Sequence, residues 1–83
     1  MGSKQWVVYL LRCSDNSFYC GVTNDIDRRL TEHNTSKRGA KYTRSRRPVE
    51  LIGSKEAGSR SEAQSLEAKI KKMKKLDKLS FFS

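Results

Sequence analysis

Few side chains in this 83-residue chain are capable of chemistry, and they are scattered along it. The chain has one histidine and no glycine-rich phosphate loop, which disfavours a catalytic triad or nucleotide hydrolysis on such a loop. What remains is a set of three phenols, a guanidinium, an imidazole and a carboxylate. These are Tyr9, Tyr19, Tyr42, Arg29, His33 and Glu67.

Together these groups have the chemistry for phosphodiester hydrolysis. A carboxylate such as Glu67 can hold one Mg²⁺ that keeps several of its waters, and such an ion polarises the phosphoryl oxygen and stabilises the leaving oxygen. An arginine fixes and neutralises the phosphate. A phenol can relay or remove the proton of an attacking water if a cationic neighbour lowers its pKa from about 10.

Two of the tyrosines belong to a predicted β-hairpin over residues 6–22, which is rich in strand-forming Val, Tyr and Phe. A two-residue loop would put Tyr9 and Tyr19 on opposite faces. A three-residue loop over residues 14–16, with Asn16 in the left-handed conformation, pairs Tyr9 with Gly21 and puts both phenols on one face. We favour the longer loop because it gathers one apolar face. That face carries Trp6, Val8, Leu10, Phe18, Cys20 and Val22.

The hairpin by itself does not require a functional role for the phenols, since tyrosines that only cap a core edge are common in strands. A helix should follow from about Asp25 to Asn34, because residues 23–25 have helix-capping chemistry. Its apolar face includes His33, with Arg29 beside it. Arg29 is either a phosphate ligand or a surface side chain whose stem covers the core.

The segment 35–47 has six Lys or Arg, no acid and no apolar period, so we expect a loop over the sheet. Basic residues interleaved with Tyr42 suit a phosphate backbone and a stacked base, and a solvated charged loop is the alternative. The net charge of +9 favours a polyanionic partner. We assign nucleic-acid contacts to Arg28, Lys37, Arg38, Lys41, Tyr42, Arg44, Arg46 and Arg47.

Pro48 suits the start of a third strand over 49–52, which could continue to Ala57. A second helix should run from a capping box at Ser61 to about Lys75. Glu67 lies on the shoulder of its apolar stripe, and residues 76–83 should form one short further turn. The sequence therefore predicts a single α+β domain over 1–83. Its order is β-β-α-β-α, with a three-stranded, mainly antiparallel sheet flanked by helices.

Composition limits the cellular setting. The chain has no apolar stretch long enough to cross a bilayer, and because Met1-Gly2-Ser3-Lys4 lacks the apolar core of a signal peptide, we expect none. Cys13 and Cys20 should face opposite sides of the sheet as reduced thiols, which is typical of a cytoplasmic protein. Two cysteines and one histidine cannot build a four-ligand zinc site.

From about Trp6 to Leu79 the sequence resembles the GIY-YIG endonuclease superfamily, and in particular its small stand-alone bacterial (YhbQ-like) members. Val7-Val8-Tyr9 stands at the first family motif and Tyr19-Cys20-Gly21 at the second. Residues 22–34, 39–44, 47–51 and 61–72 are similar to the later family segments. The ordered set is much more specific than either triplet.

The resemblance implies an endonuclease that uses Mg²⁺ or Mn²⁺ on DNA, with a preference for branched, flapped or damaged substrates in repair. It implies that Tyr9 is the general base, that Tyr19 and His33 tune it or position water and phosphate, and that Arg29 clamps the phosphate. Glu67 matches the metal-binding glutamate.

The chain also departs from the family pattern. The first motif lacks its glycine, and Val22 stands where some relatives have a lysine. No asparagine follows Glu67. We expect no second DNA-binding domain, and therefore an intrinsic activity that is weak or depends on a protein partner for targeting. Two non-catalytic alternatives remain at this point: a basic nucleic-acid-binding module, and a basic scaffold that docks on an acidic protein or a ribonucleoprotein.

Overall fold

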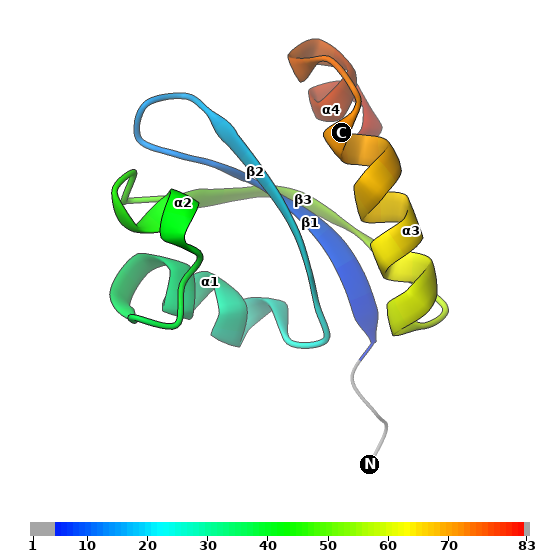
Figure 1. The fold of residues 1–83 in the computed structure, drawn as a ribbon, viewed down its shortest axis with the longest axis horizontal. Helices are drawn as coiled ribbons and strands as arrows, with labels where there is room; N and C mark the ends of the chain where they lie inside the picture. Colours follow the sequence, from blue (N-terminus) through cyan, green and yellow to red (C-terminus); the bar gives the residue numbers. More distant parts are fainter. Residues whose placement is uncertain (1–4, 83) are drawn as a thin grey trace.

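The computed structural model describes residues 5–82 and has the predicted α+β architecture. Three antiparallel strands form a sheet in the order β2-β1-β3, with β1 (Trp6–Arg12) in the centre, β2 (Phe18–Thr23) on one edge and β3 (Glu50–Ala57) on the other. Helices α1 (Ile26–Thr35) and α2 (Lys41–Arg44) lie on one side, and α3 (Arg60–Lys71) and α4 (Lys75–Phe82) on the other (Figure 1).

The hairpin has the three-residue loop, as predicted. The Cys13 amide donates to the Ser17 carbonyl over 2.8 Å, and Asn16 has a positive φ of 67°. Tyr9 therefore pairs with Gly21 across β1 and β2. This register puts both phenols on the face of the sheet that α1 covers.

The two faces of the sheet bury different clusters. Val8, Leu10 and Cys20 pack under α3 and α4, whereas Tyr9, Leu11, Cys13 and Val49 pack with residues of α1. The two cysteines are free thiols on opposite faces, as expected. The alternation along β1 therefore decides which side chains lie in the aliphatic core and which reach the polar side.

Three local predictions need correction. The segment 35–47 is not all loop, because Thr43 and Arg44 donate their amides to the Ala40 carbonyl and close the single turn of α2. Helix α3 is capped by Ser59 rather than Ser61: Ser59 Oγ accepts from the Glu62 amide, while the Glu62 carboxylate accepts from Gly58. Ser59 precedes a glutamate by three residues, which makes it the stronger capping box.

The third correction is at the C-terminal end, where α4 is an eight-residue helix rather than one short turn. Phe81 and Phe82 pack against the aliphatic core from this helix. Among residues 5–82, no helix is long and apolar enough to cross a membrane.

Candidate active site

A hollow of about 360 Å³ opens along the β2 edge of the sheet, between α1 and α3. Five residues singled out from the sequence line it: Tyr9 and Tyr19 from the hairpin, Arg28 and Arg29 from α1, and Glu67 from α3. Groups that are up to 58 positions apart in the chain thus meet at one place. The remaining lining residues are Trp6, Gly21, Val22, Thr23, Asn24, Arg60 and Gln64.

Tyr9 is the buried centre of the hollow, with only 1% of its surface exposed. Its ring lies across the backbone of Gly21 on the neighbouring strand. A Cβ at Gly21 would come 2.4 Å from the phenol oxygen, far inside any normal contact. The glycine is needed for the close approach of Tyr9 rather than for unusual backbone angles, since its φ is not positive.

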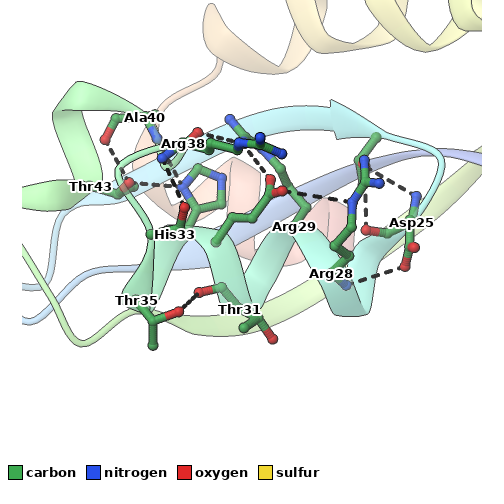
Figure 2. Close-up of polar contacts among 12 residues, drawn as sticks. Asp25, Arg28, Arg29, Thr31, His33, Thr35, Arg38, Ala40 and Thr43 are labelled. Atoms are coloured by element: carbon green, nitrogen blue, oxygen red, sulfur yellow. Dashed lines mark hydrogen bonds and ion pairs between the residues drawn. The ribbon is translucent and has the colours of Figure 1, made fainter.

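The Tyr9 hydroxyl lies 2.8 Å from Nε2 of His33, which is fully buried. On the other side of the imidazole, Nδ1 lies 2.8 Å from the Thr43 hydroxyl (Figure 2). Thr43 in turn donates to the Ala40 carbonyl over 2.9 Å. Because Thr43 gives its proton to the Ala40 carbonyl, Nδ1 can donate to the Thr43 oxygen while Nε2 accepts from Tyr9, and this is the tautomer that a proton transfer from Tyr9 requires. The Ala40 amide lies 3.5 Å from Nδ1, at the long limit of a hydrogen bond, and favours the other tautomer.

The electrostatics keep both partners of this hydrogen bond neutral. Burial, and after it the nearby Arg29 charge, lowers the pKa of His33 to about 4. Burial raises the pKa of the Tyr9 phenol to about 12, although Arg29 acts in the opposite direction. At neutral pH a protonated phenol therefore faces a neutral imidazole that has a free lone pair. Tyr19 packs edge-on against the same imidazole, with ring centroids 5.2 Å apart.

Arg29 is fixed at the wall of the hollow by two contacts of one nitrogen and by a side-chain hydrogen bond to the Tyr9 phenol. Its Nη1 donates to the Glu32 carboxylate over 2.9 Å and to the Arg38 carbonyl over 2.8 Å (Figure 2). A guanidinium has five N–H donors, so others remain for an incoming oxyanion. With 26% of its side chain exposed, Arg29 is more than a surface residue whose stem covers the core.

Glu67 faces the tyrosines and Arg29 from α3, with 24% of its side chain exposed. Its carboxylate lies 3.6 Å from Lys71 Nζ. Within residues 5–82, no group of three or more His, Cys, Asp or Glu could cage a metal. A single carboxylate in an open polar hollow fits Mg²⁺, which retains waters and takes further ligands from a substrate phosphate.

The basic segment divides into residues that are free to meet a polyanion and residues with structural contacts. Lys37, Arg38, Lys41 and Arg44 are exposed and lie outside the hollow. Arg47 is half-buried and donates to the carbonyls of residues 32, 33 and 36, which fastens the end of α1.

Tyr42 and Arg46 form a stack beside the hollow. The Tyr42 ring lies 6.0 Å from that of Tyr19, nearly parallel, and the Arg46 guanidinium lies 3.9 Å from the Tyr42 centroid. Arg46 is also paired with Asp15 over 3.1 Å. The Tyr42 ring therefore already makes two contacts within the protein, with Tyr19 and with Arg46.

Sequence reasoning missed four residues that the structure brings to the site. Arg60 and Gln64 line the hollow, and they precede Glu67 on the same face of α3 at helical spacing. That spacing was a usable signal. Trp6 was assigned only to the apolar face, and the contact of Thr43 with His33 depends on the path of the loop, which no local pattern reveals.

Comparison with known proteins identifies the family of the chain. The family model described as the GIY-YIG catalytic domain matches residues 5–79. The chain therefore belongs to the GIY-YIG family, whose catalytic domain is of the endonuclease type.

Within the family, its relatives are small bacterial UPF0213 proteins. It is 51% identical over 77 residues to the UPF0213 protein of Syntrophus aciditrophicus. The aligned region covers 93% of this chain and 87% of that relative. It is 50% identical over 68 residues to the UPF0213 protein of Desulfotalea psychrophila. The aligned region covers 82% of this chain but only 62% of that relative.

Two solution NMR structures share the fold. The E. faecalis protein has a TM-score of 0.63 at 44% identity, with 96% of this chain and 85% of that one covered. The UPF0213 protein from Bacillus halodurans has a TM-score of 0.56 at 39% identity, with 93% and 81% covered.

Proposed function

We propose that the chain is an endonuclease that hydrolyses phosphodiester bonds of branched, flapped or damaged DNA with Mg²⁺ or Mn²⁺. The observation that carries this proposal is the convergence of Tyr9, Tyr19, Arg29 and Glu67 on one hollow. A family match alone does not distinguish an active nuclease from a relative that has lost its catalytic residues. The four side chains around one hollow are the groups that hydrolysis of a phosphodiester bond requires.

Arg29 binds the phosphate in this scheme, with the N–H groups that Glu32 and Arg38 do not use. Water attacks the phosphorus as the bond to the leaving oxygen breaks, and the leaving oxygen takes up a proton from solvent. The proton of the water passes to the Tyr9 oxygen, and the phenol proton passes over 2.8 Å to Nε2 of His33. Tyr9 thus needs no free phenolate, which its pKa of about 12 would make scarce.

Glu67 would hold the divalent cation, which when bound supplies positive charge at the phosphoryl and leaving oxygens. Tyr19 packs against the imidazole and shapes the wall that faces the phosphate. The exposed cations Lys37, Arg38, Lys41 and Arg44 would contact the DNA backbone away from the cut. A protein partner could supply targeting.

The test is cleavage of a panel of branched, flapped, abasic and duplex DNAs with Mg²⁺ and with Mn²⁺. We expect Tyr9→Phe and Glu67→Ala to lose about 100-fold or more of the rate, by analogy with loss of one preorganised group in other enzymes. Glu56→Ala is the matched control for Glu67→Ala, because Glu56 is exposed outside the hollow. Absence of any wild-type cleavage, or full activity of Glu67→Ala, contradicts the proposal.

One observation favours a second candidate, a nucleic-acid-binding module without catalysis. Lys71 lies 3.6 Å from the Glu67 carboxylate and competes with a cation there. Such a module would bind DNA in a salt-dependent manner. Its Glu67 backbone signals would not move on addition of Mg²⁺, whereas the endonuclease predicts a saturable shift.

A further inference from the structure

The wall of the hollow formed by α3 continues beyond Glu67 toward the start of the helix. Arg60, Gln64 and Glu67 are spaced by four and three residues, and all three line the hollow. At about 1.5 Å per residue, this row spans roughly 10 Å along the helix axis. That length corresponds to about two or three nucleotides of a strand at about 3.4 Å each.

Trp6 lies at the far end of this row. It is half-buried, it packs against the aliphatic core, and it also lines the hollow, so its ring is held in place at the wall. The Arg60 guanidinium lies 5.6 Å from the centroid of the indole ring. Because this distance is near the outer limit of about 6 Å for a cation–π contact, Arg60 can turn to another partner at little cost.

The chemistry of this end of the hollow selects a particular kind of ligand. The lining contains three arginines and one acid, Glu67, which favours an anion. An indole offers a stacking face to any base, and a glutamine amide can both donate to and accept from a base edge. An anion that also carries a flat, hydrogen-bonding ring is a nucleotide.

We propose that Trp6, Arg60 and Gln64 form a subsite for the strand beside the scissile phosphate. The base of the adjacent nucleotide stacks on Trp6, the Gln64 amide contacts that base or its sugar, and Arg60 pairs with a phosphate two or three nucleotides from the cut. This inference rests on the proposed function, because it takes the cut to lie between Arg29 and Glu67. It adds a direction: the strand runs from Glu67 toward the start of α3.

The subsite also narrows the substrate class. A base inside a duplex is stacked between its neighbours and cannot lie on Trp6, whereas an unpaired base can. A hollow of about 360 Å³ is at the small end of ligand pockets, which suits one nucleotide rather than a duplex. The substrate is therefore DNA with at least one unpaired nucleotide beside the cut.

Trp6 is the only tryptophan of the chain, so its fluorescence reports on this subsite. The experiment titrates the full chain in EDTA, where no cleavage interferes, with a short oligothymidylate and with a blunt duplex of equal length. We expect saturable quenching by the single strand and several-fold weaker binding of the duplex. Arg60→Gln should weaken single-strand binding by about tenfold or more, because it removes a charge-assisted contact.

Lys69→Gln is the matched control, since it removes the same charge from an exposed position of α3 outside the hollow. Equal weakening by Arg60→Gln and Lys69→Gln would indicate general charge attraction and overturn the subsite. An unchanged Trp6 signal at saturating oligonucleotide would also overturn it.

The two proposals fail in distinguishable ways. Cleavage of DNA by a protein whose Trp6 does not respond removes the subsite and leaves the endonuclease. A Trp6 response that depends on Arg60, without cleavage of any DNA in the panel, supports the subsite and removes the endonuclease.

Discussion

Substitution of Gly21 by alanine tests whether the position of the Tyr9 phenol is what the site requires. The new Cβ would lie 2.4 Å from the phenol oxygen and 2.5 Å from Cζ, whereas ordinary contacts begin near 3.4 Å. The backbone at Gly21 accepts alanine, since its φ is not positive. The phenol must therefore move by at least about 1 Å, away from its 2.8 Å contact with His33.

The expected cost follows from these distances. Overpacking of a buried site costs about 1–3 kcal/mol, and loss of the hydrogen bond to His33 adds about 1 kcal/mol. The free energy of unfolding should therefore fall by about 2–4 kcal/mol. Cleavage should fall about 100-fold, because a displacement near 1 Å in a catalytic group has that effect.

Chemical denaturation gives the stability, and single-turnover cleavage on folded protein gives the rate. Gly58→Ala is the control: its Cβ would lie equally close, 2.4 Å, to the Glu62 carboxylate, which ends a flexible side chain outside the hollow. In a Tyr9→Phe background, Gly21→Ala should cost little further activity, since the hydroxyl is already gone. A Gly21→Ala protein that cuts within twofold of wild type would refute the role assigned to the Tyr9 position.

Three further predictions concern the surroundings of the phenol. The pKa of His33 is lowered to about 4 in the folded state, so as the pH falls the imidazole is protonated in the unfolded chain before it is protonated in the folded one. The free energy of unfolding should therefore fall by up to about 3 kcal/mol as the pH drops from 6.5 to 4. In denaturation curves measured across this range, His33→Asn should lose most of this pH dependence. Thr43→Val should cost about 1–3 kcal/mol and weaken cleavage, because it leaves Nδ1 of His33 without its hydroxyl, whereas Thr31→Val at an exposed helix position should not alter the rate. Arg47→Ala should lower the melting temperature without changing the salt dependence of DNA binding, because Arg47 holds backbone carbonyls. Arg44→Ala should reduce the salt dependence of DNA binding without changing the melting temperature, because Arg44 is exposed. An Arg47→Ala protein that melts like wild type would contradict the structural role of Arg47.

The hairpin register could be predicted because its determinants are local. Loop length and alternation fix which side chains share a face, and the three-residue loop is the one that puts Trp6, Val8, Leu10, Phe18, Cys20 and Val22 on one side. The pairing of Tyr9 with Gly21 follows directly. The place of Glu67 on the shoulder of α3 follows in the same way from the 3.6-residue period.

The fate of the basic segment could not be predicted, since its six cations are equivalent in sequence. Arg47 meets the end of α1, and Arg46 meets Tyr42 and Asp15, through contacts that depend on how the loop crosses α1. The same holds for Thr43, whose hydroxyl reaches a histidine ten residues earlier. Composition predicts that such a segment is basic and surface-exposed, but not which of its side chains are already occupied.

The burial of Tyr9 is, at first view, an obstacle to its use as a base, and it is the reason that His33 matters. A dry environment disfavours phenolate and imidazolium alike, so the resting pair is neutral on both sides, and the hydrogen bond between them satisfies both groups. A proton that moves from phenol to imidazole creates an ion pair at 2.8 Å, whose mutual attraction offsets part of the cost of charging each group alone. The neighbouring contact of Nδ1 with Thr43 fixes the ring for that transfer and joins it to α2 of the basic segment. Helix α2 therefore cannot leave the sheet without releasing the imidazole that the Tyr9 phenol needs.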